Sequence, residues 1–318
     1  MSEQIKVFVD GSEGTTGLEI LKYLNARSDI QILEIDPEQR KNVEARANLH
    51  NQADISILCL PDSASREIVP LITNPDTVVI DASTAFRTHP DWAFGLPELT
   101  EGQREKIKKA KRIANPGCHS TAYLLLVRPL VDAGLLSPDA LLSATSLTGY
   151  SGGGKKMIQQ FESDPGEHLA ACPYAIAMQH KHLPEMQQWS GLDNAPAFLP
   201  TVARFYRGMI VTIPVHASQL VKPDQSAESI TDAYSKHFAG EQFINVFPAN
   251  SPEMVSGGLM DPTACAESQR AEIFVSGTGS KHFLLACRID NLCKGASGAA
   301  IQSLNIVTGV PEDTGLVA

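Results

Sequence analysis

The stretch IKVFVDGSEGTTGLEILKYL, residues 5–24, decides the fold of this chain. It begins with a short run of β-branched and aromatic residues, and it ends with a segment that carries leucines at helical spacing (Leu18, Leu21 and Leu24). Between these two parts lies a glycine turn of the form G-x-x-G-x-x-G over residues 11–17. A strand, a glycine turn and a helix in this order are typical of the first unit of a dinucleotide-binding domain. In such a unit the glycines let the backbone approach a pyrophosphate, and N–H groups of the helix bind it.

Further strands are expected over residues 30–35, 55–60 and 77–80, with a crossover helix over residues 63–71. The apolar runs are typical of strands that are covered on both faces of a parallel sheet. Because ligands of such sheets gather at the carboxyl ends of the strands, the turns that follow the strands are the expected cofactor site. The predicted cofactor-binding residues here are Gly11, Ser12, Gly14, Thr15, Thr16, Gly17, Asp36, Leu60, Pro61 and Ser83.

The residues after the second expected strand leave the choice between NAD and NADP open. Asp36 is placed where a carboxylate would bind the ribose hydroxyls and favour NAD. Arg40 and Lys41 follow closely and would suit a 2′-phosphate. A solvated loop without contact to a cofactor is the alternative for all three.

A second informative stretch is NPGCHST, residues 115–121. Pro116 and Gly117 break the preceding segment, and an apolar run that favours a helix follows. A thiol at a helix N-terminus lies at the positive end of the helix dipole, which stabilises the thiolate. Cys118 is therefore a candidate nucleophile, and the alternative is a buried structural cysteine.

After residue 130 the sequence changes character. The run SGGGKK, residues 151–156, is predicted to wrap an anionic group, with a flexible linker as the alternative. The run QHKHLPE, residues 179–185, places two histidines on one face of an extended segment. We interpret one of them as the acid/base partner of a thiol, with a surface loop or a metal site as alternatives. Strands over residues 209–215 and 283–289 and a closing helix over 296–307 indicate a second domain with a mixed or antiparallel sheet.

Composition limits the classes of function. The chain has 318 residues, which suggests two domains, and 26 basic against 36 acidic residues give a formal charge of −10. This balance argues against nucleic acid or an anionic membrane as the main partner. No apolar run is long enough to span a membrane. The six cysteines form no C-x-x-C pair, so reduced thiols and a cytoplasmic location are expected.

Seven motifs together resemble the N-acetyl-gamma-glutamyl-phosphate reductase family, in its shorter type, nearly end to end. They are the glycine turn, D-x-S-x-x-F-R from Asp81 to Arg87, G-L-P-E over 95–98, the Cys118 turn, S-G-x-G-K over 151–155, H-x-H-x-P-E over 180–185 and D-N-L-x-K-G-A-x-G over 290–298. Two positions depart from the family pattern. Ala85 stands where an acid is frequent, and Lys181 stands where arginine is frequent. At the second position a lysine ammonium, which acts as a point charge, replaces a guanidinium that can bind an anion through two parallel hydrogen bonds.

The resemblance implies an α/β fold shared with aspartate-semialdehyde dehydrogenase and related to glyceraldehyde-3-phosphate dehydrogenase. A Rossmann-type NADP-binding domain is then expected over residues 1–117 and 296–318, with the C-terminal helix returning to it. An α+β substrate and dimerisation domain is expected over residues 118–295. NADP is the implied cofactor, with NAD less favoured, and the implied assembly is a homo-oligomer, either a dimer or a tetramer.

The resemblance also implies the reaction. N-acetyl-L-glutamyl 5-phosphate, an acyl phosphate, is reduced to N-acetyl-L-glutamate 5-semialdehyde through a thioester on Cys118, with release of inorganic phosphate, in arginine biosynthesis. His180 is the first candidate for the acid/base and His182 the second. The further expected residues are Arg87, Ser151, Lys155, Lys156, Glu185 and Arg207 for the substrate and Asn291 for the cofactor. Aspartate-semialdehyde dehydrogenase and a non-catalytic NADP-binding redox sensor are the rival hypotheses.

Overall fold

The computed structural model describes residues 4–163, 169–252, 259–279 and 281–317, and these form two compact units. Unit 1 comprises residues 1–97, 102–117 and 296–316, and unit 2 comprises residues 98–101, 118–295 and 317–318. Ala318, the last residue of the expected cofactor domain, lies outside the described residues. Among the described residues, no helix is both long and apolar enough to cross a membrane.

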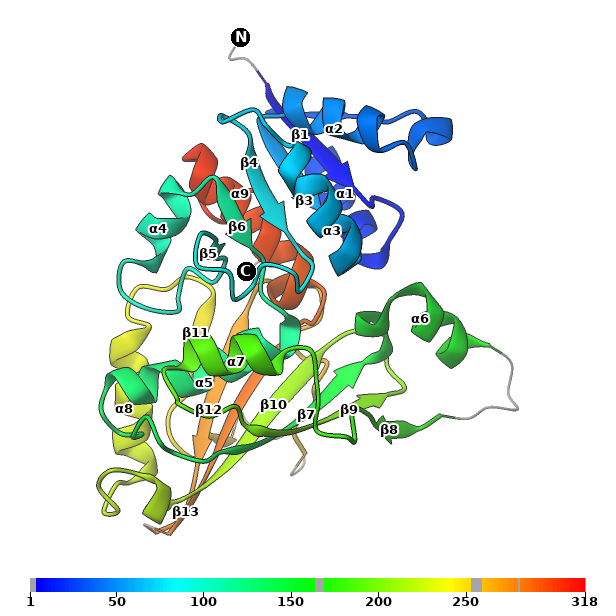
Figure 1. Cartoon of the computed structure of the whole chain (residues 1–318). Coiled ribbons are helices and arrows are strands. Elements are labelled where there is room, and N and C mark those ends of the chain that lie inside the picture. The colour runs from blue at the N-terminus through cyan, green and yellow to red at the C-terminus, as the bar shows by residue number, and fades with distance from the viewer. Residues whose placement is uncertain (1–3, 164–168, 253–258, 280, 318) are drawn as a thin grey trace. The chain divides into compact units, whose positions relative to one another are not determined.

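Unit 1 is built on a parallel sheet of six strands in the order β2-β1-β3-β4-β6-β5 (Figure 1). The chain forms β2 on one side of β1 and then returns to form β3 on the other side. The strands are β1 (Ile5–Asp10), β2 (Ile30–Leu33), β3 (Ile55–Leu58), β4 (Val78–Asp81), β5 (Ala93–Phe94) and β6 (Arg112–Ala114). This topology confirms the predicted dinucleotide-binding architecture, and its switch point lies between β1 and β3.

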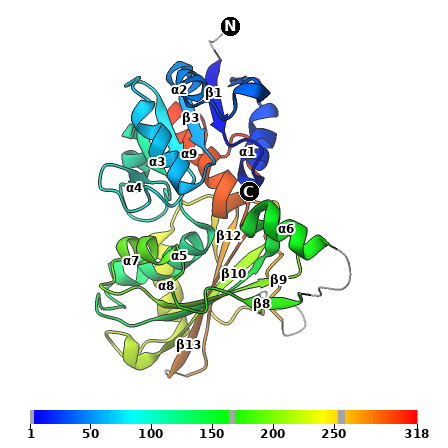
Figure 2. The same ribbon diagram turned by 45° about the vertical axis from the view of Figure 1, so that its right-hand side comes forward.

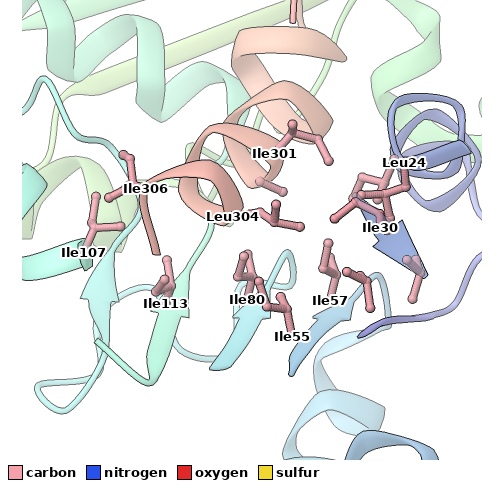
Figure 3. Packing of buried hydrophobic residues seen from close by; sticks show 14 residues of the cluster. Leu24, Ile30, Ile55, Ile57, Ile80, Ile107, Ile113, Ile301, Leu304 and Ile306 are labelled. Carbon is pink, nitrogen blue, oxygen red and sulfur yellow. The ribbon is translucent and has the colours of Figure 1, made fainter. Parts of the chain in front are cut away.

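Helices cover both faces of this sheet. One face packs against α1 (Thr15–Asn25), α4 (Gln103–Lys109) and α9 (Gly298–Thr308), and the other packs against α2 (Val43–Gln52) and α3 (Asp62–Ile68), which η2 (Val69–Leu71) extends. Figure 3 shows the core on the first face, where Ile301 and Leu304 of α9 lie over Ile57 and Ile80. The closing helix therefore belongs to unit 1, because its apolar side chains complete this core.

Two strand ends in unit 1 were predicted wrongly, and one leucine of α1 faces outward. Leu24 is buried and Leu21 packs against the same core as Ile20, whereas Leu18 is 47% exposed. The strands β2 and β3 each end two residues earlier than expected. In both cases the chain turns at a proline, at Pro37 after β2 and at Pro61 after β3.

Unit 2 is built on a mixed sheet of seven strands in the order β11-β12-β13-β10-β7-β9-β8 (Figure 2). The strands are β7 (Ser143–Gly149), β8 (Ala171–Pro173), β9 (Ala197–Ala203), β10 (Met209–His216), β11 (Ile244–Val246), β12 (Ala271–Ser276) and β13 (His282–Ile289). The helices are α5 (Cys118–Asp132), α6 (Gly154–Glu162), α7 (Leu183–Ser190) and α8 (Ala227–His237). Helix α5 packs on β10 and β13, with α7 and α8 beside it.

A fully buried ion pair ties two distant motifs together inside unit 2. The Lys294 ammonium donates to the Glu98 carboxylate at 2.7 Å, and neither side chain has exposed surface. Lys294 belongs to η6 (Cys293–Ser297), a single π-helical turn. Because both charges have left water, the stability of the segment that carries Glu98 depends on this contact.

Replacing one member of this pair is expected to destabilise the protein strongly. Lys294→Met leaves the buried Glu98 carboxylate without this cation, at an expected cost of about 3–5 kcal/mol in the free energy of unfolding. Adding Glu98→Leu should recover most of that loss, because two apolar groups need no charge partner.

Urea unfolding followed by circular dichroism measures both effects. The control is Lys22→Met, which removes an ion pair with Glu19 whose lysine is exposed and should cost under about 1 kcal/mol. A loss at Lys294 no larger than the loss at Lys22 would contradict the expectation.

Candidate active site

The glycine turn brings the start of α1 to the switch point of the unit 1 sheet. Gly11 has a φ of +81°, and a Cβ there would overlap the carbonyl oxygen of Cys59, which follows β3. A Cβ on Gly17 would lie 2.5 Å from the carbonyl oxygen of Gly11. Both positions therefore require glycine, because only a residue without a side chain lets the turn, the helix and the end of β3 approach so closely.

The first turn of α1 has the features of an anion site. Gly14 is the N-cap, and no side chain among the described residues caps the helix. The hydroxyl oxygen of Thr15 is buried without a hydrogen-bond partner in the described part of the chain. Ser12 and Thr16 flank this position. Uncapped N–H groups and an unsatisfied hydroxyl fit a pyrophosphate, so the residues present fit a dinucleotide.

A pocket of about 300 Å³ lies beside the glycine turn, between β1, α1 and the end of β2. Ser12 and Arg40 are among its lining residues, and the Arg40 guanidinium forms an ion pair with Glu13 of the turn. The Asp36 carboxylate instead accepts a hydrogen bond from the backbone N–H of Glu38 at 2.9 Å, which caps η1 (Pro37–Gln39). The charged residues that line the pocket are therefore one cation, Arg40, and one carboxylate, Glu34, and Asp36 is not among them.

The turns after β3 and β4 complete the carboxyl edge of the sheet. A side-chain carbon of Leu60 would lie 3.3 Å from a Cβ on Gly11, and Pro61 is the N-cap of α3. The Ser83 hydroxyl donates to the Asp81 carboxylate at 2.5 Å, and burial raises the pKa of Asp81. Leu60 thus lies beside the glycine turn, whereas the Ser83 hydroxyl is used by Asp81.

Cys118 is the first residue of α5 and is half-buried. Its position depends on Gly295, because a Cβ added to Gly295 would lie 2.7 Å from the Cβ of Cys118. Three other thiols have a different environment. Burial raises the pKa of Cys59 and of Cys265 to about 12, and it raises the pKa of Cys287 well above the usual value. Those three thiols stay protonated, so Cys118 is a better placed nucleophile.

Arg87 supports the loop that leads to Cys118. Its buried guanidinium donates to the backbone carbonyls of Asn115, at 2.9 Å, and of Ala82, at 3.0 Å. The Asn115 side chain in turn donates to the carbonyl of Ala296 at 2.9 Å. The described contacts of Arg87 are thus with backbone, and its predicted contact with substrate stays a prediction.

The histidines of the 180–185 motif meet a third histidine in unit 2. The ring of His180 packs edge-on to His182 at 4.6 Å and to His119 at 5.3 Å, and all three side chains are buried. Nδ1 of His180 accepts the backbone N–H of His182 at 3.1 Å, so neutral His180 carries its proton on Nε2. Nε2 of His182 lies 4.0 Å from the Glu185 carboxylate, which is also buried.

Sequence reasoning missed three members of this cluster. His119, which follows Cys118 at the helix start, is buried and contacts Ser146 and Tyr174 through its two ring nitrogens. For Ser146, the only signal was a small polar residue at an inward position of a strand. Tyr174 lies in no motif, so nothing in the sequence pointed to it.

The glycine run at 151–154 is an ordered turn and not a linker. It forms η3 (Tyr150–Gly153), and the backbone N–H of buried Ser151 donates to the carbonyl of Tyr206. The Asn291 amide donates to the Ser151 hydroxyl at 2.9 Å and accepts the backbone N–H of Gly208 at 2.8 Å. Asn291 therefore holds two turns of unit 2 together, and its predicted contact with the cofactor stays a prediction.

The predicted cations of unit 2 differ in their surroundings. Arg207 donates to the fully buried carboxylate of Asp290 at 2.6 Å and to the sulfur of Cys293 at 3.2 Å. Lys155 and Lys156 lie in the exposed first turn of α6. The charge of Arg207 is thus balanced inside the protein, whereas the two lysines face solvent. Among the described residues, no group of three or more His, Cys, Asp or Glu side chains is arranged to hold a metal ion.

Adding one methyl group at Gly295 is expected to displace the sulfur of Cys118. The Cβ of a Gly295→Ala variant would lie 2.7 Å from the Cβ of Cys118, closer than van der Waals contact allows, so one backbone must shift. We expect alkylation of Cys118 by iodoacetamide, followed by mass spectrometry, to change by about tenfold or more because a shift near 1 Å alters access and orientation. The control is Gly240→Ala, where the added methyl group meets open space but the φ of +84° strains the backbone, so it reports the effect of such strain without a clash against Cys118. Equal alkylation rates in the Gly295→Ala variant and the unmodified protein would show that Gly295 does not set the position of Cys118.

Comparisons with known proteins agree with this architecture. Residues 6–110 match the family model of the semialdehyde dehydrogenase NAD-binding domain, and residues 118–291 match that of the semialdehyde dehydrogenase dimerisation domain. Among solved structures, aspartate semialdehyde dehydrogenase II of Vibrio cholerae superposes with a TM-score of 0.71 at 16% identity, covering 97% of this chain and 99% of the other. The aspartate semialdehyde dehydrogenase of Candida albicans, solved with NADP, gives 0.67 at 15%, covering 96% and 99%. These similarities show the fold.

Curated relatives show the family more closely. A protein of Nostoc sp. named N-acetyl-gamma-glutamyl-phosphate reductase 2 is 43% identical over 98% of this chain and 99% of its own length. A protein of Brucella anthropi named N-acetyl-gamma-glutamyl-phosphate reductase is 44% identical over 96% and 98%. Identity at this level over nearly the whole of both chains leaves one assignment: the chain belongs to the N-acetyl-gamma-glutamyl-phosphate reductase family.

Proposed function

We propose that this chain reduces N-acetyl-L-glutamyl 5-phosphate to N-acetyl-L-glutamate 5-semialdehyde, with release of inorganic phosphate, by way of a thioester on Cys118. The observation that carries the proposal is a half-buried thiol at the start of α5, in the unit that also holds the three-histidine cluster. The names of the relatives support this choice of substrate. The chain is thus an oxidoreductase of arginine biosynthesis.

The chemistry begins at the sulfur of Cys118. Its thiolate attacks the acyl carbon, the bond to phosphate breaks with its electron pair, and a thioester remains on the enzyme. The first backbone N–H groups of α5 have no partners within the helix, so they suit the oxyanion that forms on the way.

The acid/base role falls to His180, with His182 as the second candidate. Because Nδ1 of His180 accepts a backbone N–H, its proton is held on Nε2. When the ring is protonated, the imidazolium can give a proton to the substrate oxygen as the thioester is reduced, and the neutral ring can take the proton back when the aldehyde leaves and the thiolate returns. Glu185 lies 4.0 Å from Nε2 of that second imidazole, close enough to orient its ring.

The glycine turn and the turns after β3 and β4 would hold the nicotinamide cofactor. The proposed contacts are Gly11, Ser12, Gly14, Thr15, Thr16, Gly17, Leu60, Pro61, Ser83 and Asn291. When bound, NADPH supplies the hydride that reduces the thioester. We prefer NADP to NAD because Arg40 lines the adjacent pocket while the Asp36 carboxylate caps a turn.

Substrate anions need local cations. Lys155 and Lys156 stand at the start of α6, where ammonium groups and backbone N–H groups suit phosphate or carboxylate. Arg87 and Arg207 remain predicted contributors whose described contacts lie within the protein. Ser151 and Glu185 are proposed to help position the substrate.

We also propose that the protein is a homo-oligomer, a dimer or a tetramer. The unit 2 sheet exposes alternate side chains such as Thr145, Leu199 and Pro214, and a matching copy would cover them. The name of the matching family model points to the same conclusion. The cytoplasmic location stays a prediction from the sequence.

The rival hypotheses are less well supported. Aspartate semialdehyde dehydrogenases resemble the chain at only 14–17% identity, which carries the fold and not the substrate. A non-catalytic redox sensor would need neither an accessible thiol nor the histidine cluster.

The reverse reaction tests substrate and nucleophile together. With N-acetylglutamate 5-semialdehyde, phosphate and NADP, we expect NADPH to form, and Cys118→Ser to lower kcat on the order of 10³-fold or more. Cys172→Ser, at another half-buried thiol, is the matched control. Faster turnover with aspartate semialdehyde would overturn the substrate assignment, and full activity of Cys118→Ser would overturn the mechanism.

The choice of cofactor is tested at Arg40. A charge-assisted contact with the 2′-phosphate predicts that Arg40→Ser raises KM for NADPH by about 10–100-fold and leaves KM for NADH unchanged. Lys106→Ser, at an exposed lysine of α4, is the control. Equal changes with both cofactors would argue that Arg40 does not contact the phosphate.

A further inference from the structure

We propose that Arg46 is a positioning residue for the cofactor. It neutralises the buried carboxylate of Asp10, so that the glycine turn can bind the anionic pyrophosphate of a dinucleotide. The proposal deepens the function proposed above and rests on the glycine turn being the cofactor site. It gives a role to a buried ion pair between β1 and α2 that the mechanism has not used.

Asp10 ends β1 and directly precedes the first glycine of the turn. Side chains alternate along this strand. Val7 and Val9 join the core under α1 and α9, whereas Phe8 packs edge-on to His50 of α2 and Asp10 contacts the same helix. The Asp10 carboxylate therefore lies on the α2 face of the sheet, at the carboxyl edge where the turn begins.

One oxygen of Asp10 receives two side chains of α2. Nε of Arg46 donates to Oδ2 at 2.8 Å, and Nη2 of Arg46 lies 2.7 Å from the same oxygen without the alignment of a hydrogen bond. Nε2 of His50 donates to Oδ2 at 2.9 Å. Arg46 and His50 are four residues apart on the helix, so both side chains reach the same carboxylate.

The contacts of His50 identify Arg46 as the compensating charge. Because a carboxylate only accepts hydrogen bonds, Nε2 of His50 carries a proton. Nδ1 lies 2.5 Å from the hydroxyl oxygen of Ser56, which has no other side-chain partner among the described residues. A neutral imidazole satisfies both neighbours, since Ser56 then donates to Nδ1. His50 thus contributes a hydrogen bond, and Arg46 contributes the positive charge.

The carboxylate of Asp10 is ionised at neutral pH. Burial raises its pKa, but the hydrogen bonds from His50 and Arg46, together with the charge of Arg46, lower it more, so that the pKa lies below its usual value. The Arg46 guanidinium is itself buried and has no other side-chain partner in the described part of the chain. The two charges therefore depend on each other.

This charge balance matters because a second anion is expected at the same edge of the sheet. The uncapped N–H groups at the start of α1 suit a pyrophosphate, whose negative charge a free Asp10 carboxylate would repel. Charges inside a protein are screened far less than charges in water. The other acid of the turn, Glu13, is exposed and pairs with Arg40 at the surface.

The test uses the opposite signs that the two halves of the pair predict. Arg46→Gln leaves the carboxylate uncompensated and should raise the Kd for NADPH about tenfold or more. Asp10→Asn leaves the cation and should keep the Kd unchanged or lower it. The Kd is measured by NADPH fluorescence with the full chain and no substrate. A merely structural role would raise the Kd in both variants.

Two further variants test charge against shape. Arg46→Lys keeps the cation, and Asp10→Asn with Arg46→Gln removes both charges, so each should stay within about threefold of the unmodified protein. The control is Arg112→Gln, which removes a half-buried arginine at the amino end of β6 that donates to the carbonyls of Thr77 and Ile72. Its Kd for NADPH should not change.

NADH separates the pyrophosphate from the 2′-phosphate. Both cofactors carry the pyrophosphate, so Arg46→Gln should weaken NADH and NADPH by the same factor. A change confined to NADPH would place the effect at the 2′-phosphate and overturn the proposal.

An unchanged Kd in Arg46→Gln would also overturn the proposal, and so would weaker binding in Asp10→Asn. If Arg46→Gln does not fold, Asp10→Asn and the double variant still decide, because a Kd raised more than about threefold in either contradicts charge compensation. Binding requires no substrate. A protein that shows the opposite effects but does not turn over the acyl phosphate would therefore contradict the proposed function and leave this inference standing.

Discussion

The buried carboxylate of Asp290 holds together the turn on which the candidate site depends. One oxygen accepts the backbone N–H groups of Leu292 and Cys293, and the other accepts Arg207 and the backbone N–H of Glu267. The backbone carbonyl of Asp290 accepts the backbone N–H of Gly295. These bonds fix the π-helical turn that brings a glycine against the sulfur-bearing residue. Because a buried carboxylate must be fully bonded, the whole turn is specified by one side chain.

Close approach of backbone is the common principle of both units. In unit 1, Gly11 and Gly17 let the start of α1 reach the end of β3. In unit 2, Gly295 admits Cys118, and a Cβ on Gly149 would lie 2.5 Å from the carbonyl of Tyr206, so that position also needs a glycine. Side-chain hydrogen bonds then hold together the backbone segments that the glycines allow to approach. Asn291, for example, joins the turn at Ser151 to Gly208. The motifs that the family shares thus serve largely to shape backbone, and the reactive groups are few.

Sequence patterns predicted the helices and strands more accurately than the contacts between side chains. Strand β1, the glycine turn and the helix that starts at Cys118 could be predicted because periodicity and turn chemistry are local. The exposure of Leu18 could not be read from this spacing, since the core that buries Ile20 and Leu24 of α1 is completed by α9, a helix at the other end of the chain. Arg87 was predicted from its charge, yet its described partners are backbone carbonyls that no sequence pattern reveals. Tyr174 was missed because only the tertiary fold brings it to His119.

The same burial has opposite consequences for different groups of the chain. It raises the pKa of Cys59, Cys265 and Cys287, so those thiols stay protonated and unreactive. It lowers the pKa of His119 to about 3, so burial favours the neutral form of that imidazole. Cys118 differs from these three because it begins a helix, where the dipole and the first backbone N–H groups favour negative charge. Selectivity for one sulfur out of six therefore requires no special residue at Cys118 itself, because desolvation suppresses at least three of the others and the fold leaves this one at a favourable helix end.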